Sequence, residues 1–239
     1  MVPRLPGCGQ RKRREFLCCR PTVLERGDFM NAQTCLKKLQ YVGVLSFATV
    51  SPDGTPQIRC ISAIHYETDA LYFFTARGKG FCKELLRDGR VQILAYTRYN
   101  EMIRVSAKAI PVPRADQKKW IDVIFEEQPY LANVYPNDTR EIGIVFSIRD
   151  MEIEYFNLAV HPIFRENYIV GNRRIKQKGY EITNHCIGCG TCAENCPQNC
   201  IKAGKPYQIM QEHCLHCGSC YEHCPVQAVM QKDSNFLKP

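Results

Sequence analysis

Nine of the 15 cysteines lie between residues 186 and 224, and eight of them follow one repeated spacing. Residues 186–197 read CIGCGTCAENCP and residues 214–225 read CLHCGSCYEHCP, so each segment has the form C-x2-C-x2-C-x3-C-P. Comparing 185–201 with 213–229, eight of 17 positions are identical, which indicates an internal duplication. A loop with a cysteine at every third position can place thiolates at neighbouring corners of a cubane, so the spacing predicts 4Fe–4S clusters.

Three cysteines of one run leave a cluster one ligand short, and the fourth thiolate must come from elsewhere. In bacterial two-cluster ferredoxins the cysteine before the proline ligates the other cluster, and residues 181–232 resemble such a dicluster ferredoxin domain. The alternative is zinc, but zinc ribbons use pairs of cysteines, which a duplicated four-cysteine run ending in proline does not fit. The resemblance assigns one cluster to Cys186, Cys189, Cys192 and Cys224, and the other to Cys214, Cys217, Cys220 and Cys196.

A ninth cysteine, Cys200, has Ala228 as its counterpart in the second half of the duplication. We expect Cys200 to be a small apolar residue packed near a cluster and not a ligand. Histidines also gather in this segment, and we expect them to lie on the surface or behind the ligands, where they could tune a cluster potential. They are His185, His213, His216 and His223.

The net charge of +8 and the 15 cysteines, taken alone, suggest a nucleic-acid-binding protein or a secreted disulfide protein. Residues 1–29 carry +4, residues 30–180 carry +5 and residues 181–239 carry −1. The basic start contains no apolar segment typical of a secretory signal, and no apolar run approaches the roughly 18–20 residues of a membrane span. We therefore expect a reducing, cytoplasmic location, with no nucleic-acid or membrane partner.

Residues 1–29 include four consecutive basic residues and three prolines, without a hydrophobic period. We expect a disordered extension here, and a disordered tail over 233–239. One alternative is a basic arm for nucleic acid or anionic lipid, with Cys18 and Cys19 as lipidation sites. Another is that Met30 is the working initiator, because regular structure is predicted directly after it.

From residue 30 the pattern changes to runs of aromatic and β-branched residues, separated by turn signals. Helices are predicted at 30–40, 79–88 and 114–128. Six or seven antiparallel strands with few helices favour a mainly β (α+β) fold with a small barrel over a βαβ fold. The predicted strands cover 42–50, 55–66, 70–75, 91–97, 102–112, 142–148 and 151–156.

Residues 56–76, PQIRCISAIHYETDALYFFTA, are followed by a lysine-containing turn, a helix and VQILAY. This order resembles the pyridoxamine-5′-phosphate-oxidase-like FMN-binding split barrel over about residues 30–157. The resemblance places Arg59 at the flavin-contacting arginine of the family. Thr75 and Lys79 match the T-x3-K form of its phosphate-binding turn.

An FMN phosphate carries about two negative charges, and a hydroxyl, a lysine and turn N–H groups are suitable partners for it. Lys83, one helical turn beyond Lys79, is a competing phosphate ligand. The backbone around Ile61 and the side chain of Gln92 are expected to contact the flavin ring. Without the cofactor, Arg59 and Lys79 would read as solvated surface charges and Thr75 as a helix cap.

The chain also departs from the oxidase proper. The family's second basic residue, five positions after the arginine, is Ile64 here, and a ferredoxin segment replaces the arginine-rich substrate motif at the C-terminus. Pyridoxamine phosphate oxidation is therefore not expected. The combination of barrel and clusters resembles a group of flavo-iron–sulfur proteins of anaerobes, and the resemblance implies a homodimer with FMN between its subunits.

Residues 158–180 read as a linker between the two domains. One interpretation of its basic residues is a docking patch for an acidic, ferredoxin-like redox partner, and the plainer one is a solvated connector. The basic residues are Arg165, Arg173, Arg174, Lys176 and Lys178.

The main functional hypothesis is an oxidoreductase in which two 4Fe–4S clusters exchange electrons with an FMN that reduces or oxidises a small organic substrate. The reductase direction is favoured, and no catalytic side chain can be named. The first alternative is a flavo-ferredoxin electron carrier without a substrate. The second is a redox sensor whose barrel binds FMN, haem or a deazaflavin. No G-x-G-x-x-G dinucleotide motif follows a strand, so electrons are expected to arrive through a partner protein.

Overall fold

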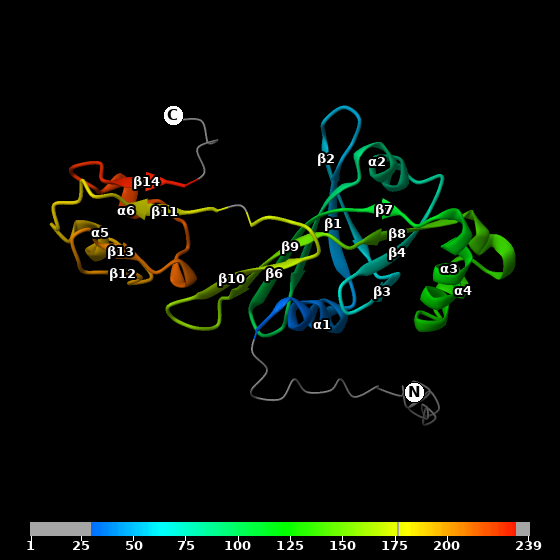
Figure 1. Ribbon diagram of the computed structural model, residues 1–239. Helices are drawn as coiled ribbons and strands as arrows, with labels where there is room; N and C mark the ends of the chain where they lie inside the picture. The colour runs from blue at the N-terminus through cyan, green and yellow to red at the C-terminus, as the bar shows by residue number, and fades with distance from the viewer. Residues whose placement is uncertain (1–29, 176, 233–239) are drawn as a thin grey trace, which may run out of the picture.

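The computed structural model describes residues 30–175 and 177–232 (Figure 1). The expectations for the extension 1–29, including Cys18 and Cys19, for Lys176 and for the tail 233–239 fall outside these residues. No described helix combines the length and the apolar character needed to cross a membrane.

The larger of the two principal sheets is antiparallel and has the strand order β10-β9-β6-β5-β1-β2. Buried side chains alternate with half-buried or exposed ones along β1, β5 and β6, as expected for a sheet with one face on the core. Its strands are β1 (Leu45–Val50), β2 (Pro56–Ile61), β5 (Arg90–Tyr96), β6 (Glu101–Lys108), β9 (Met151–Asn157) and β10 (Phe164–Val170).

The second sheet has the order β3-β4-β8-β7, with β3 (Ile64–Tyr66), β4 (Leu71–Ala76), β7 (Ile110–Pro111) and β8 (Gly143–Ile148). The mainly β antiparallel fold that we predicted is confirmed, but the two sheets contain ten strands and not six or seven. The predicted runs 55–66 and 102–112 each break and continue in the other sheet, so each run supplies two strands. The tenth strand is β10, which lies inside the expected linker.

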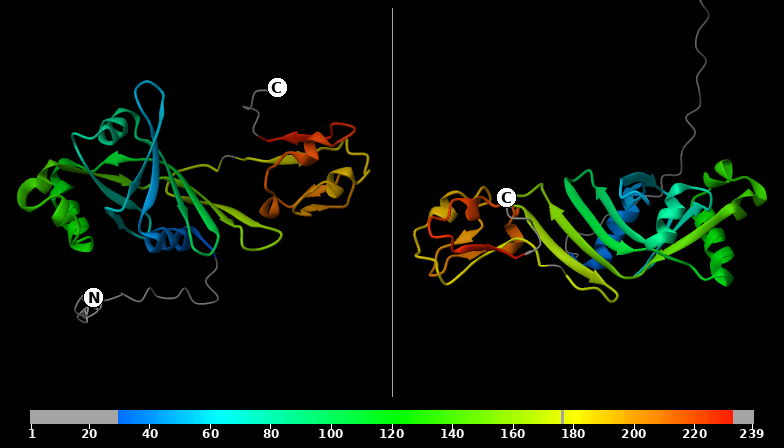
Figure 2. Two further views of the ribbon diagram at one scale, coloured as in Figure 1. Left: turned by 180° about the vertical axis from the view of Figure 1, so that it is seen from behind. Right: turned by 90° about the horizontal axis from the view of Figure 1, so that it is seen from above.

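The main core lies between the sheets and includes Phe47, Phe73 and Phe146. Helix α1 (Ala32–Val42) adds buried Cys35, Leu36 and Leu39 to it, and the side chain of Asn31 caps the start of the helix. Every residue of β4 is buried, because a second cluster that includes Phe74 packs the other face of this strand against α3 (Gln117–Glu127). Figure 2 shows α3 and α4 (Leu131–Val134) together at the end of the molecule away from the C-terminal domain.

A buried carboxylate ties α1 to the large sheet. Glu101 on β6 accepts hydrogen bonds from Lys38 at 2.8 Å and from Tyr155 at 2.7 Å, and it also accepts one from Thr97. Burial alone would raise the pKa of Glu101, but the hydrogen bonds from Lys38 and Tyr155 hold the pKa below its ordinary 4.5. The ionised form of Glu101 therefore stabilises the folded state.

We expect Glu101→Gln to lower the free energy of unfolding at pH 7 by about 1–3 kcal/mol, the cost of leaving buried partners poorly satisfied. Because the folded-state pKa is depressed, the stabilisation is present above pH 4.5 and is lost as pH falls through the folded-state pKa. The difference between wild type and variant should therefore shrink below pH 4 in urea unfolding curves. Exposed Glu126→Gln is the matched control, and an equal effect of both variants at pH 7 contradicts the prediction.

The C-terminal domain is built from two similar halves. Strand β11 (Tyr180–Ile182) pairs with β14 (Val229–Gln231), and β12 (Ile201–Lys202) pairs with β13 (Gln208–Ile209). A short helix follows the first cysteines of each run, α5 (Thr191–Glu194) after Gly190 and α6 (Ser219–Glu222) after Gly218. Both glycines have φ 87°, a left-handed conformation that favours glycine, so the sequence duplication extends to the backbone.

Candidate cofactor sites

The turn between β4 and α2 (Gly80–Asp88) is the candidate phosphate site. Thr75 is buried near the end of β4, on the face that carries Phe73, and Lys79 is the N-cap residue of α2. No side chain caps this helix start, so its free N–H groups and the helix dipole favour an anion. The Nζ atom of Lys79 lies 5.9 Å from the ring centroid of Tyr135.

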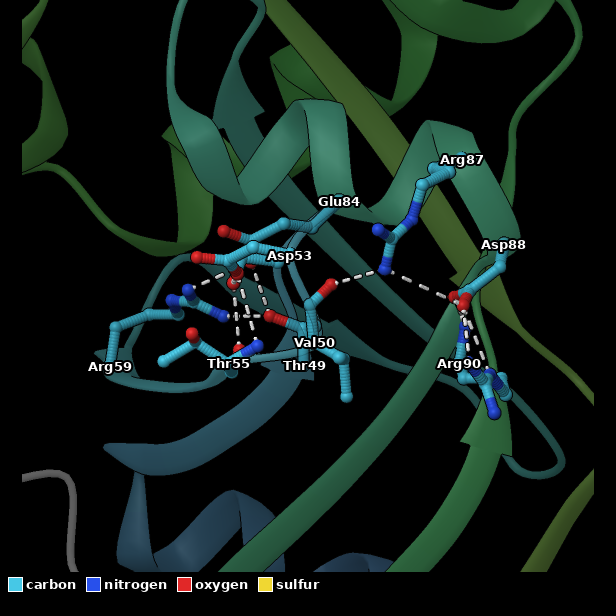
Figure 3. A network of polar contacts seen from close by, with 10 residues as sticks. Thr49, Val50, Asp53, Thr55, Arg59, Glu84, Arg87, Asp88 and Arg90 are labelled. Carbon is cyan, nitrogen blue, oxygen red and sulfur yellow. Dashed lines mark hydrogen bonds and ion pairs between the residues drawn. The ribbon is translucent and has the colours of Figure 1, made fainter.

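Arg59 reaches the same helix from β2. Its guanidinium forms an ion pair with Glu84 of α2 at 2.9 Å and donates to the hydroxyl of Thr49 (Figure 3). Thr49 also donates to Glu84, so three side chains close one small network. The guanidinium packs 4.6 Å above the ring of Phe81 in the first turn of α2. This network fixes the orientation of Arg59 beside the helix start, and the remaining N–H groups of Arg59 can bind an anion.

Phe81 lies between the predicted flavin-contacting arginine and the predicted phosphate turn. It follows Lys79 by two positions, lies under Arg59, and stacks on Phe73 with ring centroids 5.8 Å apart. Phe73 and Thr75 share one face of β4. Arg59 and Thr75 therefore lie on the Phe73 side of β4, whereas the Nζ atom of Lys79 lies over Tyr135, which packs against Phe74 on the other side of this strand.

The other predicted flavin contacts differ in their placement. Ile61 lies at the end of β2 on the same face as Arg59 and packs against the main core. Gln92 does not join them, because its register partner Ala48 places it on the outward face of the sheet, where it accepts a hydrogen bond from Ser106. Lys83 is exposed on α2.

Sequence reasoning missed Glu84 and Thr49, which hold Arg59. Glu84 is 7% exposed although it is charged. One signal was available: Glu84 falls beside Leu85 on the predicted apolar face of the helix, where an acidic residue needs a buried partner. Sequence reasoning also missed the contact between the hydroxyls of Ser62 and Tyr130, which lie 2.5 Å apart. This contact joins segments that are distant in the sequence, the end of β2 and the segment after α3.

Gly143, at the start of β8, lies against the candidate phosphate turn. It pairs with Ala76, its carbonyl accepts a hydrogen bond from Arg77 at 2.7 Å, and a Cβ atom there would lie 1.8 Å from the ring of Phe74. We expect Gly143→Ala to lower the free energy of unfolding by about 1–3 kcal/mol through overpacking. Gly78→Ala is the control, because a Cβ at Gly78 meets nothing within 4 Å. Equal midpoints in urea unfolding for both variants contradict this expectation.

The C-terminal domain contains a pocket lined by four of the predicted ligands, Cys196, Cys214, Cys217 and Cys220. Three come from the second run and one from the first, which is the crossed set that the ferredoxin pattern implies. No three His, Cys, Asp or Glu side chains among the described residues are grouped to hold a single metal ion. The crossed thiol lining fits a 4Fe–4S cluster.

The cysteines before the prolines occupy equivalent positions in the two halves. The N–H of Ala228 donates to the sulfur of Cys224 at 3.2 Å, and the N–H of Cys200 donates to the sulfur of Cys196 at 3.5 Å. Cys200 lines the pocket, and its thiol hydrogen-bonds to Cys214, which lowers the pKa of the Cys214 thiol and raises that of Cys200. Cys200 is 1% exposed and its counterpart in the second half is Ala228, which agrees with Cys200 as a packed thiol.

The four histidines of this segment have different environments. His216 is half-buried, and burial together with the nearby charge of Arg165 lowers its pKa to about 4. The ring of His213 lies 2.7 Å from the carbonyl oxygen of Ile163. His185 and His223 are exposed. His216 is therefore neutral at pH 7.

Two family models match the chain. Residues 32–145 match the model described as pyridoxamine 5′-phosphate oxidase, and residues 185–228 match the 4Fe–4S dicluster domain. Among curated proteins, a ferredoxin of Butyribacterium methylotrophicum is 50% identical over 30 residues, which are 13% of this chain and 54% of the ferredoxin. The chain thus spans about half the length of this relative.

Similar solved structures cover the barrel. A NimC/NimA family protein from Clostridium acetobutylicum is 19% identical, with a TM-score of 0.46, over 56% of this chain and 90% of that one. An FMN-binding protein related to pyridoxamine 5′-phosphate oxidase, from Nostoc punctiforme, is 15% identical, with a TM-score of 0.44, over 58% of this chain and 93% of that one.

Proposed function

Because this chain joins a pyridoxamine-5′-phosphate-oxidase-like FMN-binding split barrel to a 4Fe–4S dicluster domain, we propose that it is an oxidoreductase that reduces a small organic substrate. The presence of both cofactor domains in one chain carries this proposal. The clusters transfer single electrons and FMN supplies one- or two-electron chemistry, so the pair can connect a one-electron donor to a two-electron substrate.

The chain's own residues bind and orient the cofactors. Arg59, Thr75 and Lys79 hold the FMN phosphate together with the N–H groups at the start of α2. Glu84 and Thr49 keep Arg59 in place. The side chain of Ile61 lies on the same face of β2 as that of Arg59, and its backbone would contact the flavin ring. Lys83 and Gln92 stand outside this proposed set, since Lys83 lies one turn beyond the start of α2 and Gln92 faces away from Arg59.

The eight cysteines of the two runs hold the clusters in crossed sets. Cys196 joins Cys214, Cys217 and Cys220 around the pocket that the structure describes, and by the equivalence of the halves Cys224 joins the first run, Cys186, Cys189 and Cys192. Burial of Cys192, Cys214 and Cys220 excludes water from one side of the thiolates. This arrangement favours a reducing, cytoplasmic location.

The exposed apolar face of the large sheet supports a homodimer. The outward face of the large sheet exposes Ile58, Leu94 and Tyr96, with 72% of Ile58 accessible. Apolar groups on one sheet face are costly in water, and we assign this face to a second copy of the chain. We also propose that electrons arrive from a ferredoxin or another redox partner protein, because no G-x-G-x-x-G dinucleotide motif follows a strand in the sequence.

The proposal is tested with the purified full-length protein under anaerobic conditions. After reduction with dithionite, excess reductant is removed and candidate acceptors are added while the flavin absorbance is followed. Reoxidation by a small organic acceptor at turnover rates supports the enzyme. Reoxidation by redox proteins alone overturns it in favour of the electron carrier, and protein that binds no flavin overturns both.

A further inference from the structure

The C-terminal domain contacts the barrel through β10 and the turn before it. Ile163 donates its N–H to the side chain of Gln198 at 2.7 Å, and its carbonyl oxygen lies 2.7 Å from the ring of His213. Arg165 donates to the carbonyl oxygen of Cys214 at 3.2 Å. Gln198 and Cys214 both line the pocket of Cys217 and Cys220. Residues that line this pocket therefore contact the barrel directly.

Arg165 belongs to a group of paired charges. It is 6% exposed and pairs with Glu154, which is 5% exposed. Glu154 also pairs with Arg104 at 2.8 Å and with Lys178 at 3.6 Å, whose side chains are 46% and 38% exposed. Arg165 thus shares its carboxylate partner with two cations nearer the solvent. Buried charges are weakly screened, so the Arg165 guanidinium acts on its neighbours more strongly than a surface charge would.

Arg165 is the member of this group that contacts the C-terminal domain. Its guanidinium packs 4.7 Å over the ring of Phe156, on the side of the strand away from the core. The ring and Glu154 hold the guanidinium while one N–H points to Cys214. The distance from the cation to the first ligand is therefore fixed by packed neighbours on both sides.

We propose that Arg165 is a positioning residue that raises the reduction potential of the cluster held by Cys214, Cys217, Cys220 and Cys196. The inference rests on the proposed cluster assignment. Reduction adds one electron to the oxidised cluster, with no bond formed or broken and no proton required. The electron comes from a one-electron donor, and the added negative charge is stabilised by the Arg165 guanidinium and by polarisation of the Cys214 peptide. Electrons in the domain are thereby biased toward the cluster that faces the barrel.

The test is a redox titration of the reconstituted full-length protein with dithionite, followed by electron paramagnetic resonance. In Arg165→Met, one cluster should shift to a more negative potential and the other should stay unchanged, which makes the second cluster an internal control. We expect the ratio of electron occupancies to change about tenfold, which is about 59 mV for a one-electron couple. Arg165→Lys keeps the charge and should shift the same cluster less. Arg173→Met, an exposed residue that donates to Ser106, should shift neither.

Glu154→Gln provides a change of opposite sign. Removing the carboxylate increases the positive charge beside Cys214, so the same cluster should shift to a more positive potential. Disruption of packing alone does not give opposite shifts for Arg165→Met and Glu154→Gln, so opposite shifts confined to one cluster support the proposal. Equal shifts of both clusters, shifts of the same sign in the two variants, or no shift overturn it. Iron analysis of the wild type separates these results from a failure of the proposed function, which would show as missing clusters.

Discussion

A Cys196→Ser variant is expected to lose the same cluster as Cys214→Ser and to keep the cluster that Cys192→Ser loses. The reason is the pocket in which Cys196 lies together with the cysteines of the second run. Each ligand variant should lower the iron content from about eight to about four atoms per chain. Paramagnetic resonance spectra of the dithionite-reduced variants show which cluster remains.

Cys200→Ser is the matched control for Cys196→Ser. Cys200 lines the same pocket and lies 3.5 Å from the sulfur of Cys196, but its counterpart in the other half is an alanine. Both clusters should persist in this variant. If Cys196→Ser instead gives the spectrum of Cys192→Ser, the ligands do not cross between the halves.

Arg59→Met is expected to weaken FMN binding by roughly 10- to 150-fold, because a hydrogen bond to a charged group contributes about 1.5–3 kcal/mol. The substitution also leaves Glu84 buried without its cation, which would lower stability. FMN binding is therefore also measured for the double variant Arg59→Met/Glu84→Gln, in which neither charge remains, and compared with that of the wild type. Dissociation constants are measured by quenching of flavin fluorescence on binding to the apoprotein.

Lys79→Met should weaken FMN binding to a similar extent as Arg59→Met, since Lys79 approaches the same helix start. Lys83→Met is the control, because Lys83 is an exposed lysine of the same helix. Far-ultraviolet circular dichroism verifies that each variant is folded. A larger loss with Lys83→Met than with Lys79→Met would move the phosphate one turn along α2 and contradict the assignment.

The sequence predicted the ferredoxin domain because its spacing repeats, and a repeated local pattern does not depend on distant contacts. The predicted linker 158–180 contains a strand, because Phe164–Val170 forms β10. Arg165 was counted among the basic residues of a solvated connector. Arg165 is buried because Glu154, eleven residues earlier on β9, pairs with it, and that partner is visible only once the strands are in register.

The candidate flavin site stays a prediction. Arg59, Thr75 and Lys79 follow the order of a known motif, and in the structure Arg59 pairs with Glu84 of α2, Thr75 lies near the end of β4 and Lys79 is the N-cap residue of α2. Gln92 was predicted to contact the flavin only because of its position in the order of these motifs along the sequence. Strand alternation shows that Gln92 and Val91 face opposite sides, but which of them shares a face with Arg59 depends on the register of β5 on β1, and a single sequence does not contain that register.

The strand order of the large sheet has a consequence for electron-transfer rates. Arg59 lies on β2 at one edge, and Arg165 lies on β10 at the other. Five interstrand steps separate these strands, so the path along the curved sheet measures about 24 Å. Figures 1 and 2 accordingly show the C-terminal domain and α2 on opposite sides of the barrel. In the proposed arrangement, with FMN beside Arg59 and a cluster beside Arg165, electron transfer within a single chain would span most of the width of the large sheet, and tunnelling rates fall steeply with distance.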